Sequence, residues 1–172
     1  MRFLPRLLIG AEVLPVWMMA CAASQPSPSE GRLAIATVER DRFCDEDAEH
    51  AERSVLRDVR SAEPLYVTER VGKTSYDARL VGARLWLPAR PGLTPQWLER
   101  TLRCHQARHV LQPDSAQPTV PDPFWLPDGW IEIDVEPERG GFVAVLRADD
   151  VAEGQQIYAR AQAFVAKPPG QR

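Results

Sequence analysis

Lysine is almost absent from this chain: it stands only at Lys73 and Lys167, so nearly all of the positive charge is arginine. The 172 residues include 21 basic and 24 acidic side chains, a formal net charge of −3 at pH 7, and no run of basic residues breaks this balance. Such a surface gains little from releasing the counterions of a phosphate backbone. The composition therefore predicts a protein without a nucleic-acid partner.

The sequence also lacks the motifs of common catalytic sites. It has no Gly-x-Ser-x-Gly nucleophile elbow and no glycine-rich phosphate loop. The metalloprotease motif His-Glu-x-x-His is missing too, because Gln106 stands where a glutamate base would follow His105. We therefore predict that the chain is not an enzyme. A hydrolase whose site is assembled from dispersed residues stays as a third, weaker hypothesis.

A long hydrophobic run is missing as well, and the apolar stretch 7–20 is shorter than the ~20 residues that span a bilayer. Arg2 and Arg6 precede this stretch and small residues follow it, which are the parts of a secretory signal. Residues 1–20 are therefore predicted to be a signal peptide. Glu12 departs from the apolar character of such a segment.

The segment Met18-Met19-Ala20-Cys21 resembles a bacterial lipobox, in which lipid is attached to the cysteine and cleavage occurs just before it. We expect residues 21–31 to be a lipid-anchor cysteine and a flexible spacer rich in Ser and Pro. Ala22 follows the cysteine, where an aspartate would favour the inner membrane, so we expect an outer-membrane lipoprotein facing the periplasm. The alternative is ordinary cleavage after Ala22 or Ala23, which would discard Cys21.

The remaining residues predict a single α+β domain over 32–167 and a disordered tail over 168–172. Short turns between adjacent strands favour a small antiparallel or mixed sheet with helices packed on one face, and the order of elements favours a ferredoxin-like arrangement. The expected elements are a strand at 33–39, a helix that begins after Asp41 and is closed by Pro64, strands at 65–71 and 75–87, a helix from Thr94 to about Val110, strands at 130–136 and 142–148, and a helix capped by Asp149 or Asp150.

The second predicted helix has the clearest start in the chain. Thr94 is a good N-cap and Pro95 suits the first helical position. The helical spacing places Trp97 on the side of the core. A proline-rich connection follows, and its pair Phe124-Trp125 either folds back on the sheet edge as a lid, which we favour, or anchors a partner.

The sharpest candidate for chemistry is the run from Cys104 to His109. His105 and His109 are four residues apart and therefore lie on one helix face. Two imidazoles beside a thiolate are ligands that zinc or copper binds. Further ligands near Cys44 are available to complete such a site: Asp45, Glu46 and His50. The competing interpretation, which we favour, is that these histidines lie at the edge of the core in a stripe with Leu98 and Leu102.

Two cysteines, Cys44 and Cys104, remain after Cys21. Two cysteines in an exported protein favour a disulfide. Because both fall on predicted helices, the bond requires helices that pack with Cα atoms within about 7 Å. It would close a loop of about 60 residues and contribute roughly 4 kcal/mol. Two separately buried thiols are the alternative.

Several segments carry a resemblance to a known group of proteins. They include Gly92-Leu93-Thr94-Pro95, Cys104-His105-Gln106-Ala107-Arg108 and Ala159-Arg160-Ala161-Gln162-Ala163. The chain from Val81 to Val165 is similar to an uncharacterised family of exported bacterial proteins and lipoproteins with no known activity. The resemblance implies export and a shared domain, and no reaction. Those relatives often have another cysteine in the connection after the second helix, which this chain lacks, so the resemblance implies Cys44 as the only internal partner of Cys104.

These observations predict an exported bacterial envelope lipoprotein, held to the membrane through Cys21, whose domain acts in binding or assembly. Its partner would be a protein or a small molecule, and no cofactor is expected. The alternative function is a periplasmic domain that binds zinc or copper through Cys104, His105 and His109.

Overall fold

The structure, a computed structural model, describes residues 27–112 and 121–168. The predicted signal peptide, the lipid-attachment residue Cys21 and residues 169–172 of the predicted tail lie outside these ranges. In the described part, no helix has the length and apolar character needed to cross a membrane.

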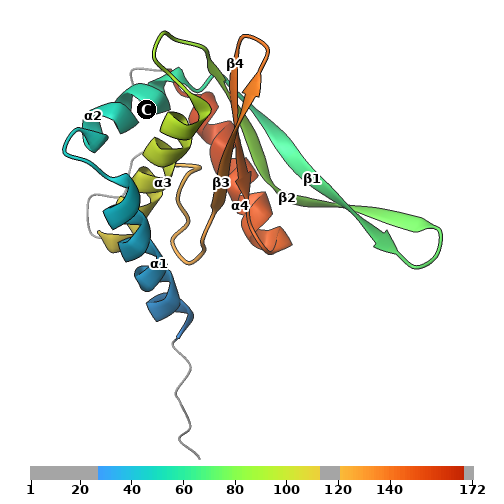
Figure 1. The fold of residues 1–172 in the computed structure, drawn as a ribbon. Helices are drawn as coiled ribbons and strands as arrows, with labels where there is room; N and C mark the ends of the chain where they lie inside the picture. The colour runs from blue at the N-terminus through green and yellow to red at the C-terminus, as the bar shows by residue number, and fades with distance from the viewer. Residues whose placement is uncertain (1–26, 113–120, 169–172) are drawn as a thin grey trace, which may run out of the picture.

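The described residues form four helices and four strands. In chain order these are α1 (Pro28–Phe43), α2 (Ala48–Asp58), β1 (Ser61–Val71), β2 (Ser75–Pro88), α3 (Pro95–Leu111), β3 (Glu132–Glu138), β4 (Gly141–Arg147) and α4 (Val151–Val165). Figure 1 shows α1, α2 and α3 grouped beside the sheet, while the hairpin β1–β2 extends away from the body.

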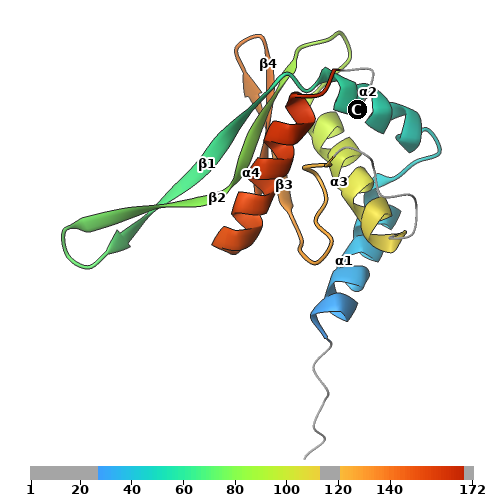
Figure 2. The ribbon, with the colours of Figure 1, turned by 180° about the vertical axis from the view of Figure 1, so that it is seen from behind.

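The four strands form one sheet in the order β1-β2-β4-β3, and each neighbouring pair is antiparallel. Leu85 is paired with Ala144, and Ala144 with Val135, so these side chains share one face. That face is buried against apolar side chains of α3 and α4, among them Leu98 and Ile157. Figure 2 shows α4 lying across it. The predicted α+β class, with helices packed on one face, is confirmed.

The connectivity differs from the ferredoxin-like arrangement that we expected. That arrangement has the order β-α-β-β-α-β, whereas the described residues run α-α-β-β-α-β-β-α. The sheet consists of two hairpins joined through α3. Their turns contain Gly72 at φ 78° and Gly140 at φ 82°, backbone conformations that favour glycine.

The predicted strand at 33–39 is wrong, because α1 covers these residues. Ser27 and Glu30 form a capping box: the Ser27 hydroxyl accepts the Glu30 N–H at 3.3 Å, and the Glu30 carboxylate accepts the Ser27 N–H at 2.7 Å. Ala36 is fully buried against α3. Capping and tertiary packing therefore override the strand-like alternation. The helix also includes residues 28–31, which we had placed in the flexible spacer.

The predicted helix from Asp41 to Pro64 is wrong at both ends. Helix α1 continues to Phe43, and α2 covers only Ala48–Asp58. Pro64 does not end a helix; it lies in β1, paired with Ala83 of β2. Proline is tolerated there because β1 is an edge strand, with one side of its backbone free of ladder hydrogen bonds.

The two later helices begin where the sequence predicts. The hydroxyl of Thr94 accepts the N–H of Trp97 at 3.2 Å, and a carboxylate oxygen of Asp150 accepts the N–H of Glu153 at 2.7 Å. The predicted orientation of Trp97 is wrong, since 37% of this residue is exposed. Helix α3 buries Leu98 in its first turn instead, with no exposed surface.

The end of the proline-rich connection returns into the molecule. Phe124 is fully buried in the main core, and Trp125 is 8% exposed in a second cluster with Ala36 and Val110. The aromatic pair therefore folds back into the molecule, as we favoured, but Trp125 packs against residues of α1 and α3, and the described residues show no lid on the sheet edge. Residues 113–120 of this connection lie outside the described ranges. The return places Asp122 beside α3, which creates the polar cluster described next.

Candidate functional site

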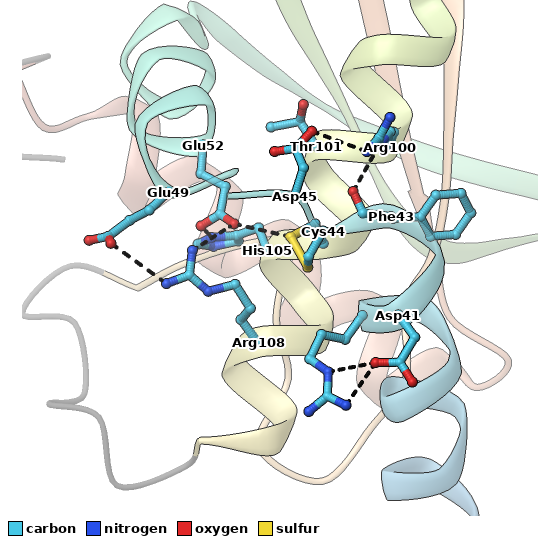
Figure 3. Close-up of a disulfide and its surroundings, with 12 residues drawn as sticks. Asp41, Phe43, Cys44, Asp45, Glu49, Glu52, Arg100, Thr101, His105 and Arg108 are labelled. Carbon is cyan, nitrogen blue, oxygen red and sulfur yellow. Dashed lines mark hydrogen bonds and ion pairs between the residues drawn. A yellow bond between two sulfur atoms is a disulfide. The ribbon is translucent and has the colours of Figure 1, made fainter. Parts of the chain in front are cut away.

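A disulfide joins Cys44, which follows α1, to Cys104 in the middle of α3 (Figure 3). The two Cα atoms are 5.1 Å apart, and the bond spans 60 residues of sequence. This pairing is one of the two alternatives that the sequence left open. Because Cys104 has no free thiolate in this state, it does not serve as the metal ligand that our alternative hypothesis required.

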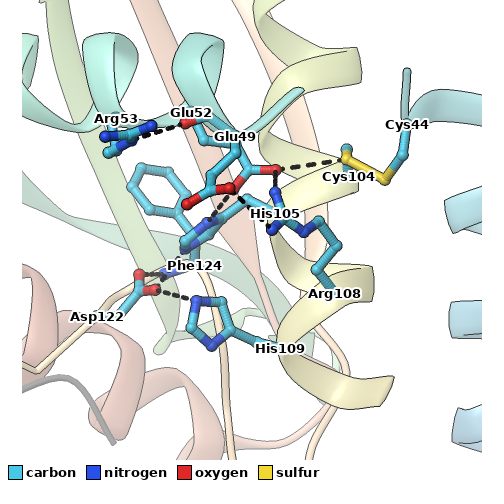
Figure 4. A network of polar contacts seen from close by, with 10 residues as sticks. All are labelled: Cys44, Glu49, Glu52, Arg53, Cys104, His105, Arg108, His109, Asp122 and Phe124. Atoms are coloured by element: carbon cyan, nitrogen blue, oxygen red, sulfur yellow. Dashed lines mark hydrogen bonds and ion pairs between the residues drawn. A yellow bond between two sulfur atoms is a disulfide. The ribbon is translucent and has the colours of Figure 1, made fainter. Parts of the chain in front are cut away.

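His105, the next residue of α3, lies between two buried carboxylates (Figure 4). Its Nδ1 is 3.2 Å from Oε2 of Glu52 on α2, and its Nε2 is 2.5 Å from Oδ2 of Asp122. All three side chains are less than 9% exposed. Helix α3, helix α2 and the returning connection thus meet at the imidazole of His105.

The other oxygens of these carboxylates also have partners. Arg108 donates from Nη1 to Oε1 of Glu52 at 3.1 Å, and the backbone N–H of Phe124 donates to Oδ1 of Asp122 at 2.9 Å. Oε1 of Glu52 lies 3.4 Å from the sulfur of Cys104. That is a close contact rather than a hydrogen bond, because a disulfide sulfur has no proton to donate. The polar cluster is therefore satisfied by its own residues.

The charge state of His105 follows from this enclosure. Burial by itself lowers the pKa of the imidazole, but the charges and hydrogen bonds of Asp122 and Glu52 outweigh burial and raise the pKa to about 10. For Asp122, burial raises the pKa, but the charge and hydrogen bond of His105 together with the N–H of Phe124 and the nearby His109 outweigh burial, so the pKa is lowered overall. At neutral pH the cluster is an imidazolium between two carboxylates.

His109 differs from its neighbour in both exposure and charge. Its side chain is 24% exposed, and its Nε2 is 3.9 Å from Oδ2 of Asp122, too far for a hydrogen bond. Burial, followed by the positive charge of His105, lowers the pKa of His109. This neutral imidazole lies 4.5 Å from the ring of His105, edge to face, and lines a cavity of about 250 Å³.

Three side chains with metal-binding atoms lie close together, but they are not the three that the sequence predicted. Among the described residues, His105, His109 and Asp122 offer ligand atoms within 4.8 Å of one another. The predicted ligand Cys104 is replaced by Asp122, which the sequence did not single out because it lies 17 residues from His105. The other suggested ligands do not join this set; Asp45, for example, pairs with Arg100 at 3.1 Å.

The geometry at His105 opposes metal binding in this arrangement. Zinc prefers tetrahedral coordination at about 2.0 Å, which places two nitrogen or oxygen ligands about 3.3 Å apart, whereas Nε2 of His105 and Oδ2 of Asp122 are 2.5 Å apart and hydrogen-bonded. A protonated imidazole also has no lone pair to offer. The arrangement therefore provides a buried ion network that holds α2, α3 and the returning connection together.

No protein-family model, no curated protein and no solved structure matches this chain. The resemblance to exported bacterial proteins consequently stays a prediction.

Proposed function

We propose that this chain is an exported bacterial envelope lipoprotein, held to the outer membrane by lipid on Cys21, whose α+β domain acts by binding rather than by catalysis. The observation that carries the proposal is the disulfide between Cys44 and Cys104. Disulfides persist in oxidising compartments such as the periplasm and are rare in the reducing cytosol. The signal-like residues 1–20 and the lipobox-like segment point to the same compartment.

The polar cluster does not provide a free catalytic acid or base. A general base or acid needs a site from which it reaches a substrate proton. Both ring nitrogens of His105 are instead held by Glu52 and Asp122, and all three side chains are buried. The cluster accordingly stabilises the domain, and recognition would take place elsewhere on it.

Intact mass of the protein, expressed from its full gene in a bacterium and alkylated without reductant, tests this proposal. We expect a chain that begins at Cys21, is heavier by a diacylglycerol or three acyl chains, and has neither Cys44 nor Cys104 alkylated. A Cys21→Ser variant should lose the lipid and keep the disulfide. A full-length, unlipidated chain with all three cysteines alkylated would sink the proposal, and cleavage after Ala22 or Ala23 would sink its lipid anchor.

The second candidate function is zinc or copper binding, favoured by the ligand atoms of His105, His109 and Asp122 within 4.8 Å. Metal analysis of protein purified without chelator distinguishes it. Under our main proposal we expect no stoichiometric zinc or copper. One equivalent of metal that is lost in a His109→Ala variant and kept in the control His50→Ala would favour the metal function instead.

A further inference from the structure

Next to His105 in α3 lies a second buried polar residue, Gln106, whose side chain has no hydrogen-bond partner in the described part of the chain. Gln106 is 1% exposed, and among the described residues neither its amide nitrogen nor its amide oxygen has a hydrogen-bond partner. Burying an unpaired amide costs stability, so native proteins pair nearly all such groups. A group that stays unpaired inside the protein is available to a ligand.

Gln106 lines a cavity of about 380 Å³. The cavity lies where α1, α3 and β3 meet, elements that Figure 1 shows side by side. Trp130, just before β3, and Ile133 also line it. This volume falls in the range of small-molecule sites, about 300–1,000 Å³. The cavity is separate from the ion network, since neither His105 nor Asp122 lines it.

Two charged residues of the cavity wall present further unpaired atoms. Oε2 of Glu39 and Nε of Arg147 are buried and have no hydrogen-bond partner among the described residues. Their other atoms are held in place: Oε1 of Glu39 lies 3.7 Å from Nη1 of Arg103, and Nη1 of Arg147 lies 3.0 Å from Oε2 of Glu132. Together with the amide of Gln106, the wall residues carry two unpaired acceptor atoms and two unpaired donor atoms among the described residues. One of these acceptors, on Glu39, is anionic, and one of these donors, on Arg147, is cationic.

We propose that this cavity binds a small zwitterionic ligand that contains an amide, of the dipeptide class. The amide of Gln106 both donates to and accepts from the peptide group, Glu39 accepts from the ammonium, and Arg147 donates to the carboxylate. A ligand with a single sign of charge would leave either Oε2 of Glu39 or Nε of Arg147 without a partner. Trp130 contacts the ligand's side chain. The inference builds on the proposed binding function and names its ligand class.

Calorimetric titration of the purified, disulfide-bonded chain with L-alanyl-L-alanine tests the inference. We expect binding at one site per chain, weakened about tenfold or more when the ammonium is N-acetylated or the carboxylate is amidated, because each change removes one charge-assisted contact. No binding at millimolar dipeptide, or equal binding of all three compounds, would overturn it.

A Gln106→Met variant locates the site. Methionine has the same unbranched length and no amide, so dipeptide affinity should fall about tenfold or more while the Cys44–Cys104 bond forms as before. Gln156→Met, on the exposed face of α4, is the matched control and should bind like the parent. Unchanged affinity in Gln106→Met would overturn the site. Because the mass experiment reads lipid, cleavage and the disulfide but no ligand, a failure of dipeptide binding is distinguishable from a failure of the export proposal.

Discussion

His105 and Gln106 are adjacent on α3 and similarly buried, at 5% and 1% exposed, yet their surroundings are opposite. Both ring nitrogens of His105 lie within hydrogen-bonding distance of a carboxylate. Neither polar atom of the Gln106 amide has a partner among the described residues. The two side chains therefore mark two regions, an ion network on one side of α3 and an open polar cavity on the other.

The difference separates structural polar groups from groups that are available for recognition. A buried network stabilises a fold only when all its members are paired, because a single unpaired charge in a medium of low dielectric constant is costly. The network around His105 meets that condition. The cavity around Gln106 does not, which is the expected state of a binding site whose polar groups are completed by a ligand.

The largest expected effect comes from removing one charge of the network. Asp122→Asn keeps the acceptor for the Phe124 N–H but loses the charge that faces His105, so we expect the free energy of unfolding to fall by about 3 kcal/mol. The loss of stability is not larger because the charged His105 still pairs with Glu52. Urea unfolding at pH 7 measures it. Asp128→Asn, an exposed change in the same connection, should stay within about 0.5 kcal/mol of the parent, and an equally small loss for Asp122→Asn would contradict the network.

The network should also make stability depend on pH. The pKa of His105 is raised from 6.5 to about 10 in the folded protein. Its contribution is therefore complete below pH 6.5 and is lost as pH rises towards 10, because only the unfolded chain has released the proton. We expect stability to fall by about 1.4 kcal/mol per pH unit in this window.

Urea unfolding between pH 7 and 9 measures this slope, and a His105→Asn variant should lack it. A parent protein whose stability is constant over this range would show that His105 is neutral. His109 provides the internal contrast: its pKa is lowered, so its contribution is present above pH 6.5 and is lost as pH falls.

The smallest expected effect is a gain. Gln106→Met replaces an unpaired buried amide by an apolar side chain of similar length, so the free energy of unfolding of the ligand-free protein should rise by about 1 kcal/mol. Gln156→Met, at an exposed position of α4, should change the free energy of unfolding little. Destabilisation by Gln106→Met, measured by urea unfolding, would mean that the amide is paired in the free protein and that the two regions are alike.

Local signals predicted the later elements well. Thr94 with Pro95, and Asp150, mark helix starts because a capping side chain satisfies backbone N–H groups within its own turn. The turn around Gly72 and the strands beside it are similarly local. Residues 33–39 were mispredicted because a short stretch of mixed apolar residues suits a strand or a helix, and packing of Ala36 against α3 decides between them.

Half of the candidate site was visible in the sequence. The spacing of Cys104, His105 and His109 placed them on one helix and raised the question of metal. Glu52 and Asp122 were not found, because 53 and 17 residues separate them from His105, and no periodicity connects a second helix and a proline-rich connection to it. Gln106 was noted only as a departure from a protease motif.

By itself, the sequence determined the α+β class, the capped starts of α3 and α4 and the two hairpins, since the caps and hairpin turns depend on contacts between residues close in the chain. The tertiary structure alone decided that Cys104 pairs with Cys44, that His105 is held as a cation between two carboxylates, and that the buried amide of Gln106, beside a cavity, has no partner among the described residues. The reason is that burial and charge pairing arise only where distant segments meet, and they set the chemistry of a side chain more than its identity does.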